Sequence, residues 1–172
     1  QMKMKKFLTL GLAAIMAVSM VGCVNQHPEE ANGTAASSDD VRIVATSPAT
    51  ADICDRLELD LVGVCSSTLS TIPERYKDVT QIGTAMSPDL EILKSLKPDY
   101  VLSPSSLQSD LQPKYESIGV NSIFLNLKSV EGMYASISDL GQKFDREEQA
   151  QALVDEFNAF MEEYKKKNEG KE

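Results

Sequence analysis

The sequence has little of the material from which most catalytic and nucleic-acid-binding sites are built. Its 172 residues include one histidine, three cysteines and no tryptophan, and 6% are aromatic. Lys and Arg number 17 against 26 Asp and Glu, which gives a formal net charge of −9. Because phosphate contacts need clustered basic side chains, we exclude nucleic acid as a partner. The short basic run Lys165–Lys167 falls at a predicted helix end, where it complements the helix dipole.

Signatures of the common enzyme classes are also missing. The chain has no GxGxxG, Walker A or GxSxG motif. His27 lies in a polar segment that we expect to be solvated, so no Ser–His or Cys–His pair is available for catalysis. Cys54 and Cys65 have no CxxC partner, and we interpret them as small buried hydrophobes. A disulfide between them stays an open alternative. We therefore expect a protein that is not an enzyme.

The first 23 residues have the pattern of a bacterial lipoprotein signal. Three lysines stand within the first six positions, and the uncharged residues 7–21 follow them. That stretch is shorter than the roughly 20 residues that a spanning helix needs. It ends Met20-Val21-Gly22-Cys23, which resembles the lipobox whose cysteine is acylated. We expect lipidation at Cys23 and a protein lipid-anchored to the extracytoplasmic face of the cell membrane. An ordinary secretory signal is the alternative.

Beyond the signal the chain divides into a tether, one domain and a long helix. Residues 24–40 are polar and bury too little apolar surface to fold, so we interpret them as a flexible tether. The chain as a whole is 42% hydrophobic, which is enough for one domain with a substantial core. We assign residues 41–145 to this α/β ligand-binding domain and residues 146–168 to the helix.

Short apolar runs alternate with helical patterns along the domain. The predicted strands are Val41–Thr46, Leu61–Val64, Tyr100–Ser103 and Ile123–Leu125. Helices are predicted to begin at Ser47-Pro48, Ser87-Pro88 and Ser103-Pro104, and a further one spans Val130–Phe144. Continuous apolar strands separated by helices indicate an α/β fold with an open, mainly parallel sheet and helices on both faces.

The last helix carries the strongest periodic signal. Asp145 and Glu148 form a pattern similar to a capping box, and apolar residues then recur at helical spacing. A helix of this length, roughly 33 Å, is long for so small a sheet. We expect some of its distal apolar residues to be exposed and to favour self-association. They are Phe157, Phe160, Met161 and Tyr164.

Hydroxyl groups follow the predicted strands. Ligands bind outside the carboxyl ends of the strands in an open parallel sheet. Free N–H groups at helix starts favour anionic ligands, although plain helix capping explains the same serines. The candidate ligand-binding residues are Thr46, Ser47, Ser66, Ser67, Thr84, Ala85, Ser87 and Ser105.

Residues 82–102 resemble a known family. The run containing Gly83, Pro88, Glu91 and Leu96-Lys97-Pro98-Asp99 is similar to the N-terminal lobe of periplasmic-binding proteins for siderophores, cobalamin and haem. Nearly all of residues 41–164 share the likeness. It implies a receptor of an ABC importer, with a permease and its ATPase as partners. It also implies two lobes joined by one long helix, and we expect this chain to lack the second lobe.

Within that superfamily the likeness is stronger to the haem-binding lipoproteins of the iron-regulated surface determinant system. Met86, in the context Ile82-Gly83-x-x-Met86-x-Pro88, matches the axial methionine of their N-terminal lobe. The resemblance therefore implies haem as the ligand and Met86 as its iron ligand. The second axial ligand of the family, a histidine, belongs to the second lobe, and His27 does not match it. A ferric siderophore, a corrinoid or no ligand at all are the alternatives, and from its local pattern alone Met86 would be a core residue.

Overall fold

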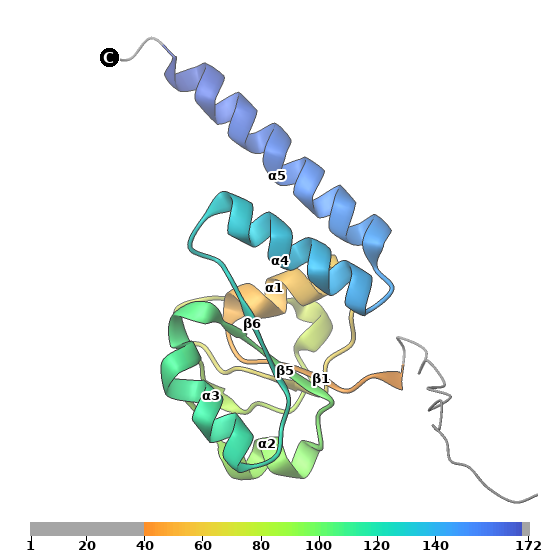
Figure 1. Cartoon of the computed structure of the whole chain (residues 1–172), viewed down its shortest axis with the longest axis vertical. Coiled ribbons are helices and arrows are strands. Elements are labelled where there is room, and N and C mark those ends of the chain that lie inside the picture. The colour runs from red at the N-terminus through yellow and green to blue at the C-terminus, as the bar shows by residue number, and fades with distance from the viewer. Residues whose placement is uncertain (1–39, 170–172) are drawn as a thin grey trace, which may run out of the picture. The chain divides into compact units, whose positions relative to one another are not determined.

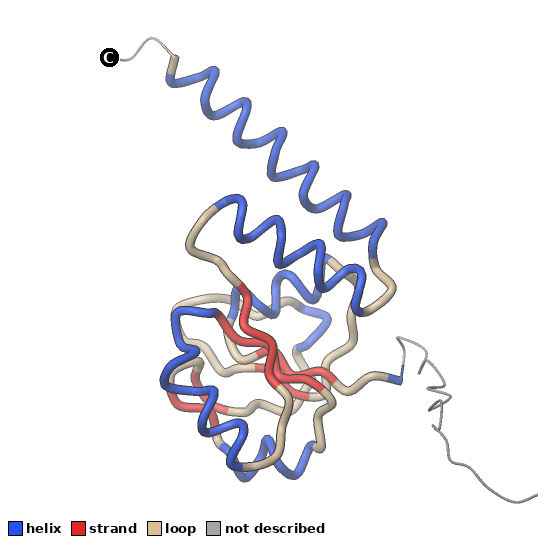
Figure 2. The backbone as a smooth tube through the Cα atoms, viewed as in Figure 1, coloured by secondary structure: helices blue, strands red, loops and turns tan. Residues whose placement is uncertain are grey.

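Four short parallel strands form the centre of the computed structural model, which describes residues 40–169. Their order across the sheet is β2-β1-β5-β6. Figures 1 and 2 show the strands with helices around them. Their bounds are β1 Ile43–Ala45, β2 Gly63–Val64, β5 Tyr100–Pro104 and β6 Ser122–Leu125. The predicted α/β class with a mainly parallel sheet is confirmed. The predicted lipoprotein signal with Cys23, the tether and His27 lie outside the described residues.

Alternating side chains of the strands build two cores, one on each face of the sheet. Ile43 and Ala45 of β1 pack into the core that includes residues of α1, α4 and α5. Val44 and Val101 pack into the other, with residues of α2 and α3. The helices are α1 Pro48–Arg56, α2 Leu90–Leu96, α3 Gln108–Ser117, α4 Val130–Lys143 and α5 Glu147–Asn168. Helices on both faces are thus confirmed (Figure 1).

Helix α1 begins where the sequence predicts. The Ser47 hydroxyl oxygen accepts the Thr50 N–H at 3.2 Å, and the Thr50 hydroxyl oxygen accepts the Ser47 N–H at 3.1 Å. This reciprocal capping satisfies two donors that the first turn leaves without intrahelical partners. The Pro48 that follows lacks an N–H and fits the first helical position.

The predicted helix start at Ser87-Pro88 is wrong. These two residues form strand β4, which pairs antiparallel with β3, Gly83–Thr84. Helix α2 begins later, where the Asp89 carboxylate accepts the N–H groups of Glu91 and Ile92, each at 3.0 Å. Ser87 therefore pairs within a strand, and the Asp89 carboxylate caps the helix instead.

Two other predicted caps differ as well. Ser103 lies inside strand β5, which is followed by the 3-10 helix η3, Ser105–Leu107, before α3 begins. Asp145 and Glu148 do not form a capping box, because α5 has Arg146 at its N-cap and no side-chain cap bond. Asp145 instead adopts a φ of +54° in the tight turn between α4 and α5.

The two halves of α5 have different surroundings. Ala150 and Leu153 in its first half are buried in the core. Further along, Phe160 is 63% exposed and Tyr164 58% exposed. Figure 1 shows this second half of α5 extending past the N-terminal start of α4. The expected exposure of the distal apolar residues is confirmed for these two. Among the described residues, no helix is long and apolar enough to cross a membrane.

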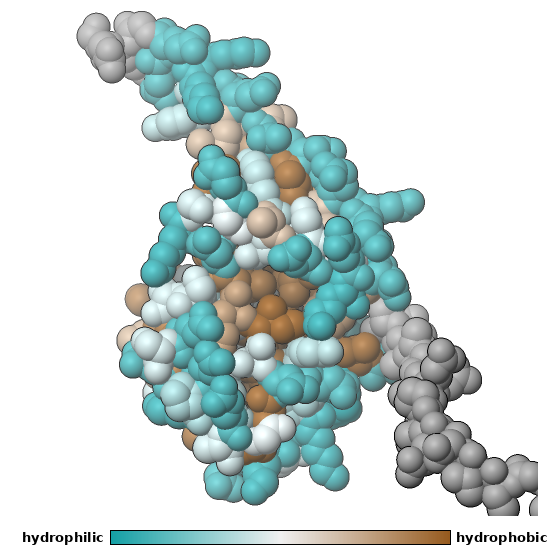
Figure 3. All heavy atoms as spheres, in the orientation of Figure 1, coloured by the Kyte–Doolittle hydropathy of each residue, from teal (hydrophilic) through white to brown (hydrophobic). Residues whose placement is uncertain are grey.

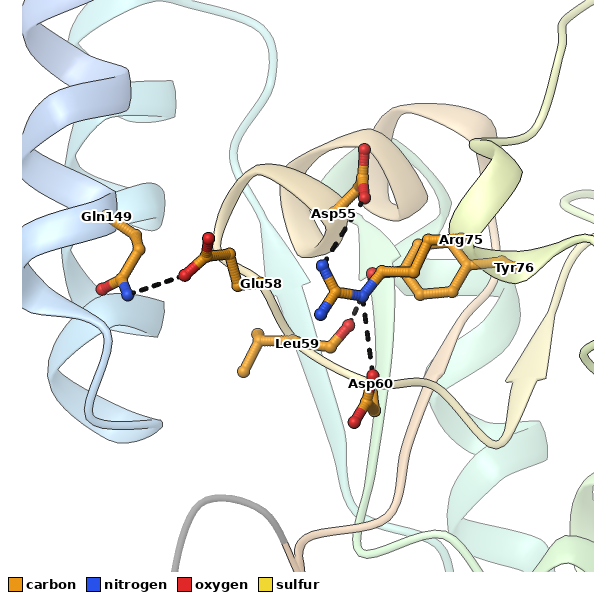
Figure 4. A network of polar contacts seen from close by, with 7 residues as sticks. All are labelled: Asp55, Glu58, Leu59, Asp60, Arg75, Tyr76 and Gln149. Carbon is orange, nitrogen blue, oxygen red and sulfur yellow. Dashed lines mark hydrogen bonds and ion pairs between the residues drawn. The ribbon is translucent and has the colours of Figure 1, made fainter.

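A polar network fastens the end of α1 to its neighbours, and Figure 4 shows its members. Gln149 of α5 donates to the Glu58 carboxylate at 3.0 Å. Arg75, in the 3-10 helix η2 (Glu74–Tyr76), lies 3.5 Å from the Asp60 carboxylate. Because α1 runs back from the carboxyl end of β1, this network lies at the opposite edge of the sheet from the strand ends. We assign it a structural role.

Candidate functional site

A hollow of about 290 Å³ opens beyond the carboxyl end of β2. The loop after β2 and the β3–β4 hairpin are held together there, because the Ser66 N–H donates to the Gly83 carbonyl at 2.9 Å. Its lining residues are Ser66, Ser67, Thr68, Gln81 and Thr84. The structure therefore brings together three predicted residues, Ser66, Ser67 and Thr84. Sequence reasoning missed Thr68, although it continues the hydroxyl run, and Gln81, which is placed by its bridge to Val64.

Met86 lies in the two-residue turn that connects β3 and β4. Gly83 permits this hairpin, since its φ is +94° and an added Cβ would lie 2.9 Å from the Ser87 carbonyl oxygen. The Met86 side chain is 69% exposed, while Ala85 beside it is half-buried and Ser87 is exposed. Met86 is therefore not a core residue, and its thioether is accessible to a ligand. In Figure 2 the hairpin is the short red pair at the left.

Five large apolar side chains of the described residues are exposed. Three follow strand ends: Leu69 is 97% exposed after β2, Met86 lies in the hairpin, and Val130 begins α4 after β6. The other two, Phe160 and Tyr164, lie on distal α5. Figure 3 shows apolar atoms at the surface over the β6 edge, where Ile123 and Phe124 are half-buried. Exposed apolar surface with a few convergent polar groups is typical of ligand sites.

Behind the strand ends lies a buried chain of hydroxyl groups. The Thr46 hydroxyl donates to the Leu102 carbonyl at 3.0 Å, so the Ser103 hydroxyl must donate to Thr46, at 2.6 Å. The Tyr115 hydroxyl then donates to Ser103 at 3.1 Å. Burial raises the pKa of Tyr115.

This arrangement places two predicted ligand-binding residues in the interior. Thr46 and Ser47 are both buried, the first inside the hydroxyl chain and the second as the cap of α1. The structure does not bring them to the hollow after β2, and a contact between them and a ligand stays a prediction. Ser105, at the start of η3, is half-buried beyond the end of β5.

Cys54 and Cys65 are free and buried, as predicted for small core residues. Burial raises the pKa of Cys54 to about 12 and that of Cys65 to about 11. Both thiols therefore stay protonated at neutral pH. The described part of the chain also holds no cluster of three or more His, Cys, Asp or Glu residues that could bind a metal ion.

A second groove, of about 310 Å³, lies between α1 and α5. Ile53, Leu153 and Phe157 line it together with charged groups of α1. One of these is Asp52, whose pKa is raised by burial and by the neighbouring Asp55. The groove contains none of the predicted ligand residues and is continuous in sequence with the exposed part of α5, so we separate it from the candidate site.

Comparison with known proteins places this site in a family. Residues 43–172 match the family model for periplasmic binding proteins. The chain is 37% identical over 158 residues to the high-affinity heme uptake system protein IsdE of Staphylococcus aureus. The matched region covers 92% of this chain and 52% of that protein.

Solved structures give the same result. An ABC transporter substrate-binding protein from Listeria monocytogenes superposes with a TM-score of 0.73 and 40% identity, over 77% of this chain and 51% of that one. S. aureus IsdE complexed with heme superposes with a TM-score of 0.72 and 38% identity, over 76% and 50%. The chain thus spans about half the length of these relatives, which are binding proteins of transport systems. Because the family match extends over the sheet, the hairpin and α5, the chain belongs to the periplasmic binding protein family.

Proposed function

We propose that this chain is part of the lipid-anchored substrate-binding component of an ABC importer for haem, and that Met86 supplies one axial ligand to the haem iron. The observation on which the proposal depends is the exposure of the Met86 thioether in the turn of the hairpin. Thr84 of the same hairpin lines the hollow after β2. The likeness to the heme uptake protein IsdE supports haem over other metal chelates. A permease and its ATPase are the partners that this function requires.

The chemistry of the site suits this cargo. A thioether is a soft ligand, and methionine ligation raises the reduction potential of haem iron. Leu69 and Val130 offer further exposed apolar surface at the strand ends, which an apolar macrocycle would cover. Since one weak axial bond does not hold haem tightly, we expect the isolated chain to bind it weakly.

A haemin titration followed by absorbance tests the proposal. We expect the parent chain to shift the haem spectrum. The substitution Met86→Leu keeps an apolar side chain but removes the sulfur, so it should give a smaller and different spectral shift. Met161→Leu on α5 is the matched control and should behave as the parent. If Met86→Leu also behaves as the parent, Met86 is not a ligand, and a siderophore or corrinoid becomes the better candidate cargo.

Lipid anchoring is tested separately, because Cys23 lies outside the described residues. We expect Cys23→Ala to abolish labelling by radioactive palmitate and retention on membranes. Cys65→Ala, which changes a buried thiol, should leave both intact. Labelling of the Cys23→Ala variant would show that the anchor assignment is wrong.

A further inference from the structure

Met86 is the most exposed of the three methionines that the structure describes. It is 69% exposed, whereas Met133 and Met161 are half-buried. Met133 also packs against the core that includes residues of α1, α4 and α5. A thioether is oxidised to a sulfoxide when an oxidant reaches its sulfur, so exposure decides which methionine reacts first. Among these three residues, Met86 is therefore the preferred target.

The hairpin keeps the Met86 sulfur from withdrawing into the core. The pairing of β3 with β4 leaves Ala85 and Met86 as the two residues of the turn. The Gly83 carbonyl accepts the Ser66 N–H at 2.9 Å, so β3 is also tied to the loop after β2. Two-residue hairpin turns adopt a small set of backbone conformations, and the Met86 backbone is thus held at the surface. An oxidant reaches the sulfur without any unfolding of the domain.

Oxidation changes what this sulfur offers to a metal. In the reaction with hydrogen peroxide an S–O bond forms and the O–O bond breaks, and the second oxygen leaves as water with both protons of the peroxide. The sulfur loses two electrons, which the peroxide gains. The product is a polar sulfoxide, which lacks the soft thioether donor that suits haem iron. Methionine sulfoxide reductases reverse the change, so it does not destroy the site.

We infer that Met86 is a reversible oxidation switch, at which a peroxide removes the iron ligand of the hairpin and the reductases restore it. The inference rests on the proposed function and adds a regulatory modification to the same residue. It requires that the sulfoxide form at Met86 before the half-buried methionines react, and that the domain stay folded when it forms.

The test treats the chain with hydrogen peroxide, removes the excess with catalase and locates the sulfoxide by peptide mass spectrometry. We expect oxidation at Met86 first, at Met161 later and at Met133 last. In a haemin titration followed by absorbance, the chain oxidised at Met86 should give the smaller and different spectral shift expected of Met86→Leu. Treatment with the two methionine sulfoxide reductases, one for each sulfoxide epimer, should restore the spectrum of the parent.

Two variants separate the switch from general oxidative damage. Met86→Leu should give the same haemin spectrum before and after peroxide. The double variant Met133→Leu with Met161→Leu retains Met86 and should respond to peroxide as the parent does. The midpoint of urea unfolding should be the same before and after oxidation of the parent, because an exposed side chain leaves no buried contact to lose.

The outcomes distinguish the switch from the function on which it rests. Oxidation of Met133 or Met161 ahead of Met86 would overturn the inference and leave the proposed function standing. A parent-like haemin spectrum after oxidation of Met86, with a changed spectrum in Met86→Leu, would do the same. A parent-like spectrum of Met86→Leu itself would instead refute the proposed function, and the switch with it.

Discussion

Replacing Ser103 by alanine removes the central link of the buried hydroxyl chain that supports the strand ends. The Tyr115 hydroxyl, whose residue is fully buried, would lose its acceptor, and Thr46 would lose a donor. A buried polar group left without a partner costs about 1–3 kcal/mol, so we expect Ser103→Ala to lower the free energy of unfolding by about 2 kcal/mol. Tyr115→Phe removes the terminal donor and leaves Ser103 bonded to Thr46, so it should cost about 1 kcal/mol or less.

The double variant of Ser103→Ala and Tyr115→Phe tests whether the two hydroxyls are bonded to each other. With Tyr115→Phe already in place, Ser103→Ala leaves no donor unpaired at that ring, so its cost should fall by about 1 kcal/mol. Urea unfolding followed by circular dichroism measures all three variants. Ser105→Ala, at a half-buried serine without a side-chain partner, is the matched control and should stay within about 0.5 kcal/mol of the parent. Strict additivity of the two changes, or a Ser103→Ala cost equal to that of the control, would refute the assigned hydrogen bonds.

Three further predictions concern the hairpin, the thiols and α5. Gly83→Ala should lower the free energy of unfolding in urea by about 1–3 kcal/mol and weaken the haemin response. The reason is that φ of Gly83 is +94° and the new Cβ would lie 2.9 Å from a β4 carbonyl oxygen. Unchanged stability would contradict this prediction. The pKa values of Cys54 and Cys65 are raised in the folded chain, so the thiols of the unfolded chain ionise first as the pH rises. The free energy of unfolding should therefore be constant below about pH 9 and should then fall by up to about 1.4 kcal/mol per pH unit for each thiol. A flat alkaline profile, or rapid alkylation of the native thiols, would show that they are not buried. Changing Phe160 and Tyr164 together to Lys should reduce the self-association seen by analytical ultracentrifugation, and a parent chain that is monomeric at every concentration would contradict this.

The order of strands and helices was predictable because the residues of each segment favour the structure that the segment adopts. Strand β1, Ile43–Ala45, lies within the predicted strand of residues 41–46. Ser47 then caps α1 and Pro48 occupies its first position, as the sequence predicts. The hairpin was not predictable, since each of its strands has two residues and its geometry depends on a positive φ at Gly83. The same pairing takes Ser87 into a strand and leaves the start of α2 to Asp89.

The candidate site was predictable in part. The rule that ligands bind at strand ends selected Ser66, Ser67 and Thr84, which do line one hollow. It also selected Thr46, whose hydroxyl forms hydrogen bonds with the Leu102 carbonyl and with the Ser103 hydroxyl, 57 positions away in the sequence. No local pattern encodes such a contact. Met86 depended on the family resemblance, because its sequence neighbourhood alone favours a core residue.

The most direct test of the account is the reduction potential of haem bound to the chain, measured by spectroelectrochemistry for the parent and for Met86→Ala. Thioether ligation favours the reduced iron, so the parent should have the higher potential and Met86→Ala should lower it and shift the haem spectrum. Since Met86 is 69% exposed, the variant should lose less than about 1 kcal/mol of stability. Leu93→Ala, at a fully buried position, should lose about 2–5 kcal/mol. An unchanged potential and spectrum in Met86→Ala would contradict the assignment of Met86 as the iron ligand.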